Sequence, residues 1–132
     1  MQNILTGIYS AYNANAALKA ALTGGLHRDD LAPQGAALTY ATYQLITGRP
    51  DYMLAGEYSE EPWFQFDIYA ATSALRDTAY DKLLVVYDDA RIAASGYTPI
   101  IMERINYRFL RDGDQNKIFR AIVEYQGSWK KS

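Results

Sequence analysis

Residues 63–70, WFQFDIYA, alternate between two kinds of side chain more strictly than any other segment. Phe64, Phe66 and Ile68 share one face, whereas Gln65 and its polar neighbours point the other way. This period of two predicts a strand with one dry face and one wet face. The chain must therefore build a sheet with a core on one side.

Residues 72–90 follow this strand at once and carry a helical period. Thr72 or Ser73 is well placed as the N-cap, because its side-chain oxygen can accept from an amide of the first turn. One apolar stripe is expected to lie on the sheet. The stripe contains Leu75, Ala79, Leu83, Val86 and Ala90, while Arg76, Asp77, Tyr80, Asp81 and Asp88 fall mostly elsewhere.

The rest of the chain supplies further elements of both kinds. Residues 3–22 hold two helical patterns, and Asn13 or Asn15 caps the second. Residues 38–47 read as a strand that ends at Gly48-Arg49-Pro50.

Residues 99–111 and 117–126 read as a hairpin closed by the turn DGDQN. On its first strand Ile101, Ile105 and Phe109 are expected on a face shared with Glu103 and Tyr107, and on its second Phe119, Ala121 and Val123 form the apolar face. With a short strand near residues 26–28, we predict an α+β fold: an antiparallel sheet of four to five strands, helices on one face, order α-β-β-α-β-β. A chain of 132 residues accommodates one domain, residues 1–132.

Composition narrows the function classes. Thirteen basic and fifteen acidic residues give a formal charge of −2, which disfavours specific nucleic-acid binding. Cysteine is absent and His27 is the single histidine, so we expect no metal site, no cofactor and no catalytic residues. The start of the chain lacks signal-peptide features and no run approaches a membrane span, which predicts a protein made in the cytoplasm.

Residues 48–62 form a longer connection than most domains use, and they contain large apolar side chains. Either these side chains fold back on the core, or they dock on a neighbouring protein, as exposed aromatic and Met residues do. The chain also contains twelve tyrosines, and each of them is either a half-buried residue of the sheet or part of a contact surface. We favour docking, with Arg49, Asp51, Tyr52, Met53, Leu54 and Tyr58 as the partner-binding residues.

Three runs, LAPQGAALTYATYQLITGRPDYMLAGE, FQFDIYAATSALRDTAYDKLLVVYD and KIFRAIVEY, resemble the tail completion (tail-to-head joining) proteins of long-tailed bacteriophages. The matching features are Pro33, the LITGRPDY turn, YAATS, and Phe119-Arg120. The resemblance implies a structural virion protein that caps the head-proximal end of the tail tube as a ring of six copies. Its partners would be the tail tube protein and the head connector, and DNA would pass through the ring without specific binding.

Two alternatives remain at this stage. Another head–tail connector or head-completion component shares the same fold expectations. A small cone-shaped α+β ligand-binding domain or enzyme is the other class, and it requires a pocket with convergent polar groups. Such a pocket would hold Asp67, Tyr69 and His27.

Overall fold

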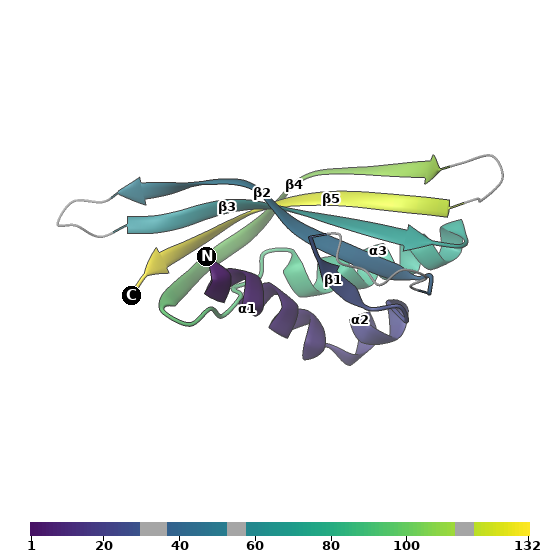
Figure 1. Ribbon diagram of the computed structural model, residues 1–132, viewed down its shortest axis with the longest axis horizontal. Coiled ribbons are helices and arrows are strands. Elements are labelled where there is room, and N and C mark those ends of the chain that lie inside the picture. The colour runs from purple at the N-terminus through teal and green to yellow at the C-terminus, as the bar shows by residue number, and fades with distance from the viewer. Residues whose placement is uncertain (30–36, 53–57, 113–117) are drawn as a thin grey trace.

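Three helices lie on one face of a five-stranded sheet in the computed structural model, which describes residues 1–29, 37–52, 58–112 and 118–132 (Figure 1). Across the sheet the strand order is β1-β2-β3-β5-β4. The strands are β1 (Leu26–Arg28), β2 (Tyr40–Tyr52), β3 (Tyr58–Ala70), β4 (Tyr97–Asp112) and β5 (Ile118–Lys131). The predicted α+β class and single-face helix layer are confirmed.

The predicted element order needs two corrections. The helical start is two helices, α1 (Gln2–Asn13) and α2 (Ala16–Ala21), ahead of β1, so the order is α-α-β-β-β-α-β-β. β1 also pairs in parallel with β2, whereas every other pairing is antiparallel.

Local capping follows the sequence closely. The Asn15 side chain accepts from the Leu18 amide at 2.9 Å and starts α2, and the Thr72 hydroxyl accepts from the Leu75 amide at 3.1 Å and starts α3 (Ser73–Tyr87).

Gly7 lets α1 approach the segment before β4, because a Cβ there would lie 2.3 Å from the Ala93 carbonyl oxygen. These contacts hold the helix layer together.

The buried stripe of α3 differs from the prediction. Ala79 and Leu83 are buried as expected, but Leu75 is 49% exposed, and Tyr80 and Tyr87 are buried. The Tyr87 hydroxyl donates to the Ile8 carbonyl at 2.7 Å. A tyrosine ring can therefore enter the core when its hydroxyl finds a partner, which a simple apolar period does not anticipate.

The predicted loop at residues 48–62 is wrong, because most of it is strand. β2 continues through Gly48, Arg49 and Pro50, which pair with Pro62, Glu61 and Glu60 of β3. Proline is tolerated here because β1 covers only Ala41–Tyr43, so this part of β2 is a sheet edge. The connection outside the described residues is 53–57.

The C-terminal hairpin is confirmed, with strands longer than predicted. Tyr107 and Phe109 share one face as expected, but Ile101 and Glu103 lie on the other face, so the single face predicted for the first strand is wrong. Register shifts between Pro99 and Ile101 and between Arg104 and Asn106 move residues from one face to the other. Met102 is buried in the core, whereas Ile101 is not. The second strand follows the prediction: Ala121 and Val123 are fully buried on the helix face. The predicted DGDQN turn falls mainly outside the described residues.

The core lies between the helices and the middle of β3 and β5. Phe66 packs against Tyr87 of α3 with ring centroids 4.7 Å apart, and its ring meets Tyr125 edge-on at 5.8 Å. Trp129 closes one end, where its indole N–H donates to the Ile92 carbonyl at 2.7 Å. No helix of the described residues lies on the opposite face of the sheet (Figure 1).

Candidate interaction surfaces

The outer halves of β2 and β3 (residues 46–52 and 58–63), here called the β2–β3 arm, extend beyond the helix layer (Figure 1), and β5 still pairs with the β3 side of this arm at Ser59, Glu60 and Trp63. The Arg49 guanidinium contacts the Glu61 carboxylate across the strands at 3.1 Å. Tyr52 is 75% exposed, and its ring lies 5.8 Å from that of Tyr58. This arm presents charge and aromatic surface together.

The sequence placed six partner-binding residues in this region, and the structure brings four of them onto the β2–β3 arm. Arg49, Asp51 and Tyr52 lie on β2 and Tyr58 on β3, and the first three are exposed. Met53 and Leu54 lie outside the described residues. Because Tyr52 is exposed, its side chain does not fold back on the core in the way the alternative interpretation required. Its role in binding a partner stays a prediction.

Two hollows lie side by side at the base of this arm on the face without helices. The first encloses about 410 Å³ between Arg49, Glu61, Trp63 and Gln126. The second encloses about 260 Å³ and shares Glu61 and Gln126 with it, adding Glu103 from β4. Trp63, Gln126 and Glu103 stand in one row across β3, β5 and β4. Neighbouring Phe64 and Tyr125 face the core, so this row faces away from it.

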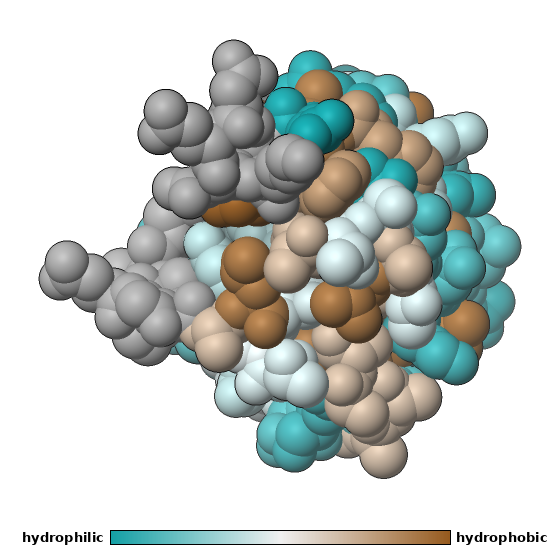
Figure 2. All heavy atoms as spheres, turned by 90° about the vertical axis from the view of Figure 1, so that its right-hand side faces the viewer, coloured by the Kyte–Doolittle hydropathy of each residue, from teal (hydrophilic) through white to brown (hydrophobic). Residues whose placement is uncertain are grey.

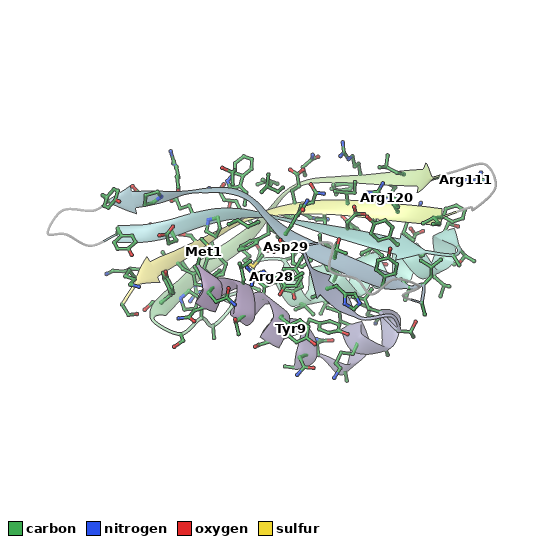
Figure 3. The ribbon with its side chains drawn as sticks, viewed as in Figure 1. Met1, Tyr9, Arg28, Asp29, Arg111 and Arg120 are labelled. Carbon is green, nitrogen blue, oxygen red and sulfur yellow. The ribbon has the colours of Figure 1, made fainter. Side chains whose placement is uncertain are left out.

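At the other end of the sheet a second arm, the β4–β5 arm (residues 105–111 and 118–122), extends in the opposite direction (Figure 1). Its arginines are interleaved with aromatic rings. The Arg111 guanidinium lies 5.6 Å from the Phe119 ring, and Arg76 of α3 lies 4.7 Å from the Phe109 ring. Figure 3 shows Arg111 beside the tip of this arm and Arg120 farther back along it.

The surface around the β4–β5 arm is partly apolar. Tyr107 and Phe109 are 55% and 43% exposed, and together with Arg76 and Tyr80 they line a hollow of about 590 Å³. At this end of the molecule hydrophobic residues lie among polar ones on the surface (Figure 2). The sequence analysis assigned this hairpin no interaction role. The signal that was available is arginine next to an aromatic residue on both strands, at Tyr107-Arg108-Phe109 and at Phe119-Arg120.

The groups that would have supported an enzyme are engaged in structural contacts. Asp67 is buried, and it accepts from the Arg120 guanidinium and from the Tyr69 hydroxyl, the latter at 3.0 Å. Burial, followed by the negative charge of Asp67, raises the pKa of Tyr69 to about 12. The Tyr69 ring also stacks on Tyr40 with centroids 4.9 Å apart. This cluster ties β2, β3 and β5 together.

His27 does not join that cluster. Its Nε2 lies 2.8 Å from the Gly24 carbonyl oxygen, which can only accept, so this nitrogen carries the proton. The hollow formed by α2, α3 and residues 38–39 is lined mainly by small and apolar side chains. His27, Asp67 and Tyr69 line none of the four hollows described above.

Among the described residues, no group of three His, Asp or Glu side chains gathers in a way that could hold a metal ion. Of the helices in the described part of the chain, none has the length and apolar character needed to cross a membrane.

Comparisons with known proteins bear on the whole chain. The family model described as "Tail completion protein gp17" matches residues 6–127. A comparison with curated proteins gave no match. Among solved structures, a chain of the "Virion of native gene transfer agent (GTA) particle" is similar with a TM-score of 0.78 and 13% identity, over 98% of this chain and 96% of that one. At this identity the likeness concerns the fold.

Proposed function

Because the chain belongs to the Tail completion protein gp17 family, we propose that it is a structural protein of a phage-like virion that completes the tail. The observation that carries this proposal is the extent of the family match, residues 6–127, which includes four strands, most of β5 and most of the helix layer. The shared fold with a chain of a gene transfer agent virion supports the same setting.

In the finer form of the proposal, copies of the chain form a ring of six that caps the head-proximal end of the tail tube. The ring joins the tail to the head connector, and DNA passes through it. The protein acts at the head–tail interface of the virion as a scaffold, with no catalytic step and no cofactor. Its partners are the tail tube protein, the head connector and further copies of itself.

The shape of the molecule supports a ring. A closed ring requires heterologous contacts, in which one patch meets a different patch on the next copy. The β2–β3 arm and the β4–β5 arm extend from opposite ends of one sheet (Figure 1) and differ in side chains, so each copy has two unlike ends. A heterologous contact between neighbouring copies joins two such unlike ends.

The test measures particle mass by light scattering for the purified protein, alone and with tail tubes of the virion that encodes it. We expect a ring in at least one condition. A single-copy mass in both conditions, with no retention on tail tubes, would contradict the proposed function.

A variant assigns the role of the β2–β3 arm. Replacing Tyr52, Met53 and Leu54 together with Ser is expected to leave the circular dichroism spectrum unchanged and to abolish ring formation or tail joining. Val85→Ser is the matched control, because Val85 is 76% exposed on α3, away from this arm. Unfolding of the triple variant would instead place these side chains in the core.

A further inference from the structure

β4 is an edge strand of the sheet, with β5 as its strand neighbour on one side (Figure 1). On its outer side the chain bonds back to Met102: the Asp89 amide donates to the Met102 carbonyl at 3.0 Å, and the Met102 amide donates to the Ala90 carbonyl at 2.9 Å. Asp89 has a φ of 54°, as in a bulge where two residues face one. The chain itself therefore adds a short piece of backbone to the outer side of β4.

Farther along β4, other backbone groups point in the same outward direction. Because Met102 bonds outward, its neighbour Glu103 bonds to β5, opposite Gln126. Alternate residues of β5 continue this pattern, so β4 bonds inward at the residues opposite them: Asn106, Arg108 and Leu110. Tyr107 and Phe109 lie between these and point their N–H and C=O groups outward. Among the described residues, no backbone group bonds to them there.

The two edges of the sheet differ in how they are protected. Beyond the residues that β1 covers, the edge of β2 carries a bulge between Leu45 and Thr47 and also Pro50, which has no N–H to donate. The bulges of β4 come before Asn106, and from there on its pairing with β5 is regular. Residues 106–111 therefore form an uninterrupted edge of roughly 20 Å.

A groove runs beside this edge on the helix face. Tyr107 and Phe109 are 55% and 43% exposed, and with Arg76 and Tyr80 of α3 they line the hollow of about 590 Å³. The Tyr80 ring meets the Phe109 ring edge-on at 5.0 Å, and the Arg76 guanidinium lies 4.7 Å from the same ring. An extended polypeptide suits such a groove, because its backbone pairs with the strand edge while alternate side chains enter the space beside the helix.

The opposite face of the same stretch carries a cation. Arg108 is exposed on the helix-free face, and its neighbour across the ladder is Ile122 of β5. None of the ion pairs among the described residues includes Arg108. A strand added to β4 places its side chains alternately on the two faces, so it can cover the aromatic rings on one face and set a carboxylate beside Arg108 on the other.

We infer that residues 106–111 of β4 receive an extended segment of a different protein, which adds a strand to the sheet. Large apolar side chains of that segment lie over Tyr107 and Phe109, and an acidic side chain lies beside Arg108. A second copy does not fit, because its β4 edge brings arginine to arginine and its β2 edge is interrupted by Pro50. That the partner is a virion protein rests on the proposed function, whereas the strand addition does not.

The probe is a synthetic peptide, Thr-Val-Glu-Tyr-Glu-Val-Thr, blocked at both ends and carrying a fluorophore. Its side-chain order is the same from either end, so it suits parallel and antiparallel addition alike. Fluorescence anisotropy measures its binding to the wild-type chain, which we expect to be saturable. The same peptide with Lys in place of Glu should bind at least ~10-fold more weakly, because it brings like charge to Arg108.

Methylation of the peptide backbone tests strand addition directly. Successive residues of a strand point their N–H groups to opposite sides, so methyl groups on alternate amides block one side and leave the other intact. Of the two peptides with complementary sets of methylated amides, one should bind at least ~10-fold more weakly than the other, because it faces β4 with its methyl groups. Equal binding by the two methylated peptides would contradict strand addition.

Variants of the chain place the peptide on this edge. Tyr107→Ser with Phe109→Ser should weaken peptide binding at least ~10-fold, since it removes the exposed rings. Arg108→Glu should weaken binding of the Glu peptide and restore binding of the Lys peptide. Ile46→Ser is the matched control, because Ile46 is 45% exposed and lies on the β2 edge. Circular dichroism of each variant confirms that it is folded.

The outcomes separate this inference from the proposed function. If the wild-type chain does not bind the peptide, or if Ile46→Ser weakens binding and the double Ser variant does not, the inference is wrong and rings on tail tubes would still support the proposed function. If the peptide binds by lowering the mass of an assembled wild-type ring, a second copy occupies the edge and the inference is also wrong. Peptide binding as expected, by a chain that is never retained on tail tubes, contradicts the proposed function and leaves the strand addition standing.

Discussion

β4 and β5 run side by side for most of their length, yet one is an edge and the other belongs to the core. Tyr107 and Phe109 of β4 pair with Val123 and Ala121 of β5 on the helix face. The β5 residues are fully buried, whereas the β4 residues are 55% and 43% exposed. The two strands share hydrogen bonds and a similar apolar content, so neither property decides which strand is buried.

The position of α3 makes the difference. Tyr87 of α3 packs on Phe66 and Tyr125, which places the helix over β3 and β5. From the outward side of α3, Tyr80 and Arg76 reach Phe109 of β4. Apolar side chains on the outer half of β4 therefore remain available to another molecule, and substitutions in the two strands should have different consequences.

The largest expected effect comes from removing a large buried side chain of β5. Trp129→Ala should lower the free energy of unfolding by about 4 kcal/mol, because it leaves a cavity and removes the indole bond to Ile92. Phe109→Ala on β4 should cost about 1 kcal/mol, since a half-exposed edge ring has few contacts to lose. Urea unfolding followed by circular dichroism measures both. Equal losses would show that β4 is as much a part of the core as β5.

A smaller effect isolates one hydroxyl on each strand. The Tyr125 hydroxyl donates to Asp88 at 2.6 Å, and Tyr125→Phe should lower the free energy of unfolding by about 1.5 kcal/mol. Tyr107→Phe removes an exposed hydroxyl and should change it by less than about 0.5 kcal/mol. The same urea experiment compares them. A loss for Tyr107→Phe that matches the Tyr125→Phe loss would remove the distinction between the strands.

The smallest expected effect concerns how the free energy of unfolding depends on pH. The pKa of Tyr69 rises from 10.0 to about 12 through burial and the neighbouring Asp67. Burial, as the first cause, also raises the pKa values of Tyr87 and Tyr125. Between pH 10 and about 12 the unfolded chain releases the Tyr69 proton while the folded chain keeps it. The free energy of unfolding therefore falls as pH rises through this window, and the Tyr69 contribution is fully present below it.

Tyr69→Phe removes this contribution, so the variant should lose less stability than the wild type across the same window. Urea unfolding at a series of alkaline pH values provides the measurement. Tyr52→Phe is the control, because its side chain is exposed at the far end of the β2–β3 arm. An identical alkaline slope for wild type and Tyr69→Phe would count against a protected hydroxyl.

Some features could be predicted from local sequence alone. Alternation at Phe64, Phe66 and Ile68 gave the correct buried face of β3, and the caps Asn15 and Thr72 started their helices. These predictions succeed because period and capping depend on atoms a few residues apart. The hairpin at the C-terminus was predicted correctly for the same reason.

Other features depended on distant residues. Gly48-Arg49-Pro50 has the composition of a turn, yet it continues as strand because Pro62, Glu61 and Glu60 lie opposite it. The bulges beside Pro99 and Arg104 changed which residues of β4 face the core. No local pattern announces either outcome, because the pairing partner fixes the register.

The candidate interaction surfaces also depend partly on local sequence and partly on tertiary structure. The sequence alone predicted a partner-binding role for Arg49, Asp51, Tyr52, Met53, Leu54 and Tyr58, which stays a prediction. Its motifs also resembled those of the tail completion family. Only the tertiary structure showed that the outer half of β4 lies outside the cover of α3 and that Arg108 and Arg111 stand far along the sheet from Glu61 and Glu103. Burial and the relative positions of such side chains are properties of the packed sheet, since they depend on which distant segments become neighbours.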